Sequence, residues 1–183
     1  MWNRGLAGAR MQDIADRAGI NKALLHYYFR SKDKLFDMIF QEAAGKFLPR
    51  VSVLFDSDIP FNDKIRAFVT NYMGLLMDNP FLPLFVLNEV HKNPEEFIIK
   101  IWGGKMPPIA EFIKQMDKEV KAGRIRPVNP MHLMLHMISM CVYPFVAKSI
   151  VTSVFKANDK QFMLMMEERK TEVADFIIHS LRP

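Results

Sequence analysis

The most restrictive feature of this 183-residue sequence is an apolar spacing of three and four residues that runs through nearly all of it. The sequence has no sustained alternation of polar and apolar residues, and no Asn-Gly or Asp-Gly pair that would signal a hairpin. Proline and glycine divide the pattern into segments of helical length. We therefore expect an all-α fold. The predicted helices cover residues 11–18, 22–29, 32–47, 62–78, 81–91, 94–102, 107–122, 130–156 and 159–181.

Local signals set the expected helix boundaries. Gly19 is placed to end the first helix, because a glycine just past a helix end readily adopts the left-handed conformation. Asn21 and Ser31 are suitable N-cap residues for the next two helices. Pro49 is expected to end the third helix. Pro144 is expected to kink the long helix around it without ending it, since apolar helical spacing resumes further along.

The composition indicates a chain with a packed core in a reducing compartment. Half of the residues are hydrophobic and 25% are charged, which excludes a disordered chain. Cys141 is the single cysteine, so a disulfide framework and a cysteine-built zinc site are excluded and a cytoplasmic location is favoured. Residues 127–147 contain no Lys, Arg, Asp or Glu, but they include two histidines and three prolines. This polarity predicts a buried or interface helix and no membrane contact.

The positive charge is concentrated near the N-terminus. The net charge is +5, and residues 1–50 hold nine Lys and Arg against five acidic residues. Such an asymmetry is expected where one end of a chain meets an anion, although a solvated basic face has the same composition.

The same end of the chain has the pattern of a helix-turn-helix unit. A helix of eight residues, a turn at residues 18–20 and a second short helix match this motif, although generic helical hairpins share the outline. The residues expected to pack between the two helices are Ile14, Ala15, Ile20, Leu25 and Phe29. The open face of the second helix is then available for a DNA major groove.

The residues of this segment resemble a known family. Residues 13–35, which read DIADRAGINKALLHYYFRSKDKL, resemble the TetR family of bacterial transcription regulators, and the similarity is dense over residues 9–36. The resemblance implies a helix-turn-helix DNA-binding domain over residues 1–47. A helical ligand-binding and dimerisation domain is implied for residues 48–183.

The resemblance also implies which residues contact double-stranded operator DNA. The set is Arg10, Met11, Gln12, Asn21, Lys22, Ala23, Leu24, His26, Tyr27, Tyr28 and Lys32. Arg10 and Leu24 depart from the family pattern, which usually has a hydroxyl residue at both positions. Tyr28 either reads DNA or packs against helix 32–47. The family's DNA-binding domain has a further helix before Gly5, so we expect the natural protein to begin upstream and this chain alone to bind DNA poorly.

For the second domain, the resemblance implies a pocket for a small apolar or amphipathic ligand and a homodimer through helices 130–156 and 159–181. Candidate pocket residues are Phe68, Tyr72, Trp102, Met106, Phe112, Met116, His136, Met137, Met140 and Tyr143. Core packing is the ordinary alternative for such apolar stripes.

These features together predict a ligand-responsive transcription regulator, a repressor that a small molecule releases from its operator. The first alternative is a sensor or interaction module of the same fold that does not bind DNA as this chain. The second is a helical metalloenzyme built on His132 and His136, which share a helix face. No catalytic constellation, cofactor motif or complete metal-ligand set is recognisable, so no enzyme is predicted.

Overall fold

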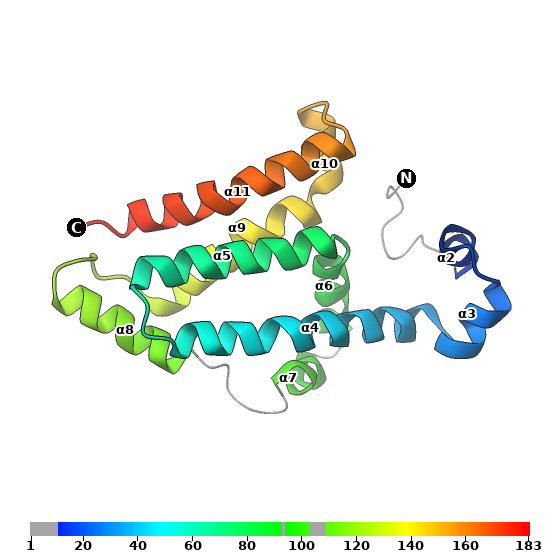
Figure 1. Cartoon of the computed structure of the whole chain (residues 1–183), viewed down its shortest axis with the longest axis horizontal. Coiled ribbons are helices and arrows are strands. Elements are labelled where there is room, and N and C mark those ends of the chain that lie inside the picture. The colour runs from blue at the N-terminus through cyan, green and yellow to red at the C-terminus, as the bar shows by residue number, and fades with distance from the viewer. Residues whose placement is uncertain (1–10, 93, 103–108) are drawn as a thin grey trace.

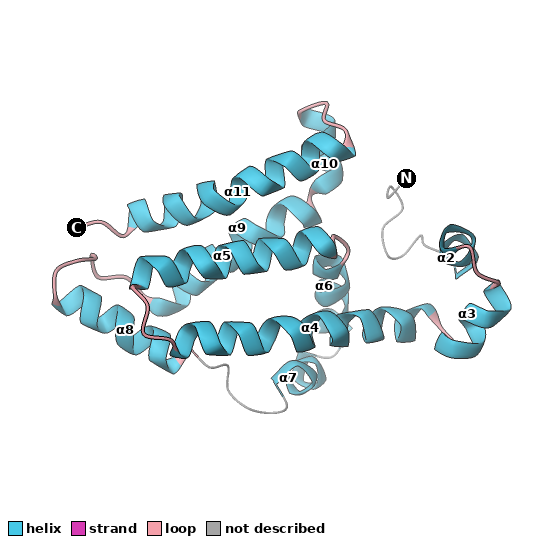
Figure 2. Cartoon of the chain, viewed as in Figure 1, coloured by secondary structure: helices cyan, strands magenta, loops and turns pink. Residues whose placement is uncertain are grey.

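The computed structural model describes residues 11–92, 94–102 and 109–183 (Figure 1). Over these residues the chain is built from helices and contains no strand, which confirms the all-α prediction (Figure 2). The helices are α2 (Met11–Ala18), α3 (Lys22–Phe29), α4 (Lys32–Asp56), α5 (Phe61–Asp78), α6 (Leu82–Lys92), α7 (Pro94–Trp102), α8 (Ala110–Lys121), α9 (Pro130–Val146), α10 (Lys148–Val154) and α11 (Asp159–Ser180).

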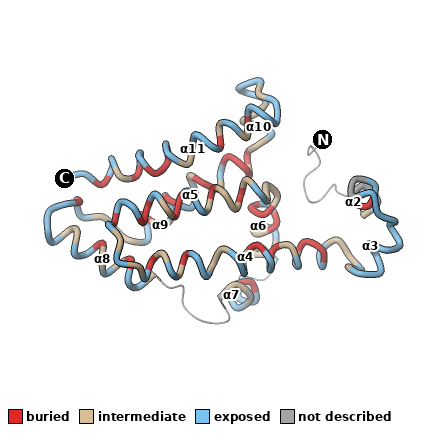
Figure 3. The backbone as a smooth tube through the Cα atoms, viewed as in Figure 1, coloured by how far each residue is buried: buried red, intermediate tan, exposed pale blue. Residues whose placement is uncertain are grey.

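Helix α5 lies at the centre of the body, where it packs against α4, α9 and α11. Its apolar side chains join those of α8, α9, α11 and the end of α4 in the main hydrophobic core. Figure 3 shows these buried positions on the inward sides of the helices. Helix α4 extends beyond the body and holds α3 and α2 at its far end (Figure 1).

Helix α4 is longer than the sequence predicted. It continues through Pro49 to Asp56, so the expected end of the third helix near residue 47 is wrong. A proline inside a helix costs about 3 kcal/mol. Val51 and Phe55, one turn apart beyond the proline, are buried in the main core, and burying each such side chain is worth about 1.5–3 kcal/mol. Tertiary packing therefore outweighs the local helix-breaking signal.

A buried lysine caps the C-terminal end of α4. Lys64 of α5 is almost fully buried, and its ammonium group donates a hydrogen bond of 2.7 Å to the backbone carbonyl of Phe55. Burial lowers the pKa of Lys64, and the nearby carboxylates of Asp58, Asp56 and Glu111 oppose this shift. The lysine thereby satisfies one of the carbonyls that a helix end leaves without a partner.

The predicted 130–156 helix is two helices in the structure. Asn129 caps α9 and Pro130 begins it, but α9 ends at Val146 and α10 leaves it at an angle of 69°. Pro144 was expected to kink this helix without ending it, and α9 indeed continues through Pro144; the bend falls three residues later, at Ala147. Lys148 holds the start of α10 against α11, because its ammonium group lies 2.7 Å from the Asp159 carboxylate and 5.1 Å from the centroid of the Phe162 ring.

Pro144 also frees a backbone carbonyl that α11 uses. A residue with an N–H group at position 144 would donate to the carbonyl of Met140, four residues earlier, but proline has no such group. Arg169 of α11 donates to this carbonyl instead, through Nη2 at 2.9 Å. The backbone hydrogen bond that Pro144 removes from α9 is therefore replaced by a contact between α9 and α11.

In the described ranges, no single helix is both long and apolar enough to cross a membrane. Helices α9 and α10 reach that length and composition only as a pair, across the bend between them.

We predict that Arg169→Met lowers the free energy of unfolding by about 1–3 kcal/mol, because the Met140 carbonyl loses its donor. The loss should shrink in a Pro144→Ala background, where the new N–H of residue 144 can bond that carbonyl. Urea denaturation of the two single variants and the double variant measures this coupling. Equal losses in both backgrounds would contradict the proposed link.

Candidate nucleic-acid interface

Helices α2 and α3 form a helix-turn-helix unit with a defined turn. Gly19 has φ +65°, the left-handed conformation expected of a glycine at a helix end, and the amide of Ile20 donates to the carbonyl of Ala15 at 3.0 Å. The side chain of Asn21 then accepts a hydrogen bond of 2.8 Å from the amide of Ala23, which caps α3. The helix-turn-helix prediction is confirmed in the described part of this segment.

A small apolar cluster fixes this unit to α4. Ala15 of α2, Leu25 of α3 and Leu35 of α4 are buried together, and Phe29 packs against them. Ile20, which was expected to pack between the helices, is 38% exposed, so that expectation is wrong. The turn directs Ile20 away from the cluster, and Leu25 supplies the contact between α2 and α3.

Helix α3 presents its remaining side chains to solvent. Lys22, Ala23 and His26 are exposed, and Leu24 is 47% exposed next to the fully packed Leu25. This face is therefore open along most of the helix, as an element that enters a major groove requires.

Two tyrosines complete the exposed face of α3. Tyr27 and Tyr28 are 79% and 67% exposed, and their rings meet edge to face with centroids 5.4 Å apart. Tyr28 therefore does not pack against α4, which removes the alternative that the sequence left open for it. Both phenol groups are free to meet a partner.

The other candidate DNA-contacting residues have more restricted surroundings. Met11 is partly buried against the Ala15 cluster, and the Gln12 amide donates to the Asp16 carboxylate at 2.6 Å. Lys32 is half-buried at the start of α4, where Ser31 caps the helix. Arg10 lies outside the described residues. The sequence did not single out Arg30, which ends α3 with φ +53°, because arginine carries no signal for a left-handed residue.

The candidate ligand-contacting residues do not gather around one cavity. Phe68, Phe112, Met116 and Met137 are buried in the main core. Tyr72 stacks on Phe47, with ring centroids 5.2 Å apart, and burial raises the pKa of its phenol.

The remaining members of that set are dispersed. His136 and Met140 line a separate cavity of about 160 Å³ between α9 and α11, while Tyr143 is exposed. Trp102 belongs to α7, but its side chain and all of Met106 lie outside the described residues. The pocket proposed from the sequence stays a prediction.

The histidine pair lacks further metal ligands in the described ranges. His132 and His136 are exposed on α9 with ring centroids 6.3 Å apart, and no group of three His, Cys, Asp or Glu side chains gathers there or elsewhere in those ranges. Burial raises the pKa of the Cys141 thiol to about 12, which keeps this sulfur protonated at neutral pH.

Known proteins are similar to this chain in sequence or in fold. HTH-type transcriptional regulator RutR of Escherichia coli K12 is 24% identical over 129 residues, which are 70% of this chain and 60% of RutR. RutR of Shigella flexneri has the same identity to this chain and the same coverage. The chain thus spans about 60% of the length of the curated relatives it matches.

Solved structures show the same fold at low identity. An HlyIIR mutant protein superposes with a TM-score of 0.60 at 19% identity, over 97% of this chain and 88% of that one. The regulator FadR from Bacillus subtilis, solved in complex with stearoyl-CoA, gives a TM-score of 0.56 at 15% identity, over 98% and 92% of the two chains.

The sequence model described as "Bacterial regulatory proteins, tetR family" matches residues 1–39. The described part of this segment holds α2, the left-handed turn and the exposed α3. With these findings together, residues 1–39 match the tetR family of bacterial regulatory proteins, and the described part of the chain shares its fold with solved regulators.

Proposed function

We propose that this chain is a ligand-responsive, DNA-binding transcription regulator, and specifically a repressor that a small molecule releases from its operator. The observation that carries the proposal is the exposed face of α3, which has a basic residue at its start and two solvent-exposed tyrosines near its end. A regulator of this kind acts on the bacterial chromosome and therefore in the cytoplasm.

In this proposal α3 enters the major groove, which is about 12 Å wide and admits a helix. Lys22 at the helix N-terminus meets a phosphate, because both its charge and the helix dipole favour an anion there. Ala23, Tyr27 and Tyr28 read base edges. Phosphate contacts set the position of the helix, and base contacts set the sequence.

We further propose that the chain acts as a homodimer through α9 and α11. Met131, Leu135 and Ile138 form an exposed apolar stripe at helical spacing on α9, and Leu164 and Phe176 are exposed on α11. Two packed helices that present apolar side chains outward suit an isologous interface. A dimer also supplies two recognition helices for half-sites about one DNA turn apart.

In this proposal, residues 1–47 bind DNA and residues 48–183 bind the ligand. Helix α4 crosses the boundary between these two parts without interruption, so a ligand that alters α4 also alters the position of α3. Such a ligand acts only through its difference in affinity for the two arrangements. The stearoyl-CoA bound to FadR supports an amphipathic effector for this fold.

We predict weak but salt-dependent binding of this chain to a fluorescently labelled DNA duplex of about 30 base pairs of mixed sequence, measured by anisotropy between about 50 and 200 mM salt. Lys22→Ala should reduce the slope of log affinity against log salt by about 1, because one phosphate contact is lost. Lys160→Ala, an exposed lysine on α11, is the matched control. A chain without salt-dependent binding would instead be the sensor module of the same fold.

We predict that Leu135→Glu produces a monomer in sedimentation velocity, because a charge on the α9 stripe cannot be buried against a second copy without a partner. Met38→Glu, at an exposed apolar position on α4, should leave the sedimentation coefficient unchanged. A dimer that survives Leu135→Glu would place the interface elsewhere.

A further inference from the structure

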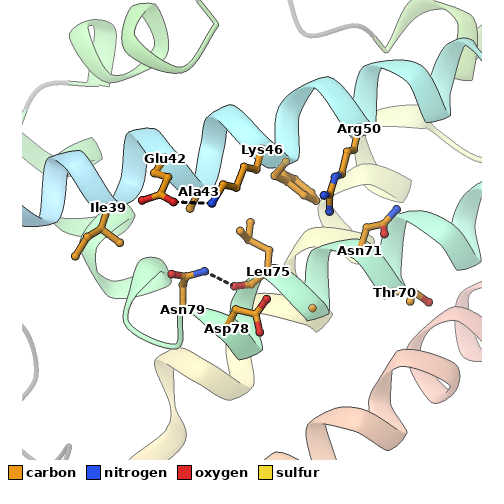
Figure 4. A pocket seen from close by; sticks show the side chains of 12 residues that line it. Ile39, Glu42, Ala43, Lys46, Arg50, Thr70, Asn71, Leu75, Asp78 and Asn79 are labelled. Carbon is orange, nitrogen blue, oxygen red and sulfur yellow. Dashed lines mark hydrogen bonds and ion pairs between the residues drawn. The ribbon is translucent and has the colours of Figure 1, made fainter.

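A groove of about 450 Å³ lies between α4 and α5, apart from the core residues that the sequence suggested for a ligand (Figure 4). The two helices run in opposite directions along it. Arg50 lies opposite Asn71 at one end, and Glu42 lies above Asn79 toward the other (Figure 4). Its size falls within the range of about 300–1,000 Å³ typical of small-molecule sites.

The groove is open because α5 has a glycine where a side chain would fill it. Gly74 lines the groove, and a Cβ atom placed on it would have no other atom within 4 Å. A glycine inside a helix costs about 1 kcal/mol relative to alanine. The space is therefore created by a residue that the helix itself does not favour.

The floor of the groove is apolar. Ala43 is buried, Phe47 is half-buried and stacked on Tyr72, and Leu75 packs from α5. This apolar patch can contact an aromatic ring or a short hydrocarbon segment, whose burial is worth about 25 cal/mol per Å², while most of the remaining exposed lining is polar.

The rim of the groove is charged differently at its two ends. Lys46 is already paired with Glu42 at 2.5 Å. In the part of the chain that the structure describes, Arg50 and Asp78 have no ion-pair partner, and Asp78 lies away from Arg50, beyond Leu75 (Figure 4). An anionic group is thus attracted to the Arg50 end and repelled from the Asp78 end.

We propose that this groove binds an amphipathic organic anion, with the apolar body along Phe47 and Leu75 and the anionic group at Arg50. The guanidinium group offers a planar pair of donors to a carboxylate, sulfonate or phosphate oxygen, and the Asn71 amide can add another. Asp78 at the far end fixes the orientation of the bound molecule.

As an effector site, the groove rests on the regulator function proposed above. One wall is α4, whose far end carries α2 and α3, and the other is α5, which packs against α9 and α11. A ligand that favours one spacing of α4 and α5 therefore favours one position of the recognition helix relative to the body.

The test uses anilinonaphthalene sulfonate, a fluorescent amphipathic anion, and the neutral N-phenylnaphthylamine, which has the same aromatic body without the sulfonate. Arg50→Gln should weaken binding of the sulfonate at least about tenfold and leave the neutral probe unaffected, because only the charge-assisted contact is lost. Gly74→Trp should abolish groove binding of both probes. Gly45→Trp is the matched control, since Gly45 lies on α4 outside the groove and also has open space around its Cβ position.

Unchanged sulfonate binding in both Arg50→Gln and Gly74→Trp would overturn the proposal, and so would an equal loss of both probes in Arg50→Gln. Circular dichroism confirms that each variant is folded. Probe binding is measured without DNA, so a chain that passes this test but shows no salt-dependent DNA binding would retain the anion site and lose the regulator function.

Discussion

The structure depends on the burial of one helix, α4, in three separate hydrophobic clusters. Leu35 belongs to the cluster that holds α2 and α3, Phe36 and Phe40 to the one shared with α6 and α7, and Phe55 to the main core. Because one continuous helix contributes to all three, the recognition helix cannot move far relative to the body without a change in α4 or its packing. The exposed α3 is therefore attached to a helix, α4, that is held by packing along most of its length.

The two prolines inside helices show how tertiary contacts decide what a local signal does. Pro49 leaves α4 continuous, since buried side chains on both sides of it hold the helix in one direction. Pro144 precedes a sharp bend, because Arg169 takes the carbonyl that it frees and Lys148 holds the next helix against α11. Proline is thus tolerated within one helix and precedes a break in another, depending on the surrounding contacts.

Much of the fold follows from local chemistry in the sequence. The caps at Asn21 and Ser31 lie where the sequence predicted them, and the left-handed turn at Gly19 follows from the absence of a Cβ atom. The end of α4 could not be predicted, since the burial of Phe55 depends on helices distant in the sequence. The apolar spacing likewise could not distinguish residues that pack in the core from residues that line a pocket. Phe112 and Met137 have a spacing that fits both roles, and the structure buries them in the core.

The α4–α5 groove could not be predicted from the sequence for a related reason. Neither Gly74 nor Arg50 belongs to a recognisable motif, and they share a site only because of the register in which α4 and α5 pack. That register also determines what the groove can do. Helix α5 contacts both α9 and α11, and α4 carries α3. In the proposed dimer, the spacing between α4 and α5 would therefore set the position of each α3 relative to the partner subunit. A molecule bound in the proposed groove would change the distance between the two α3 helices, which operator binding requires to be fixed.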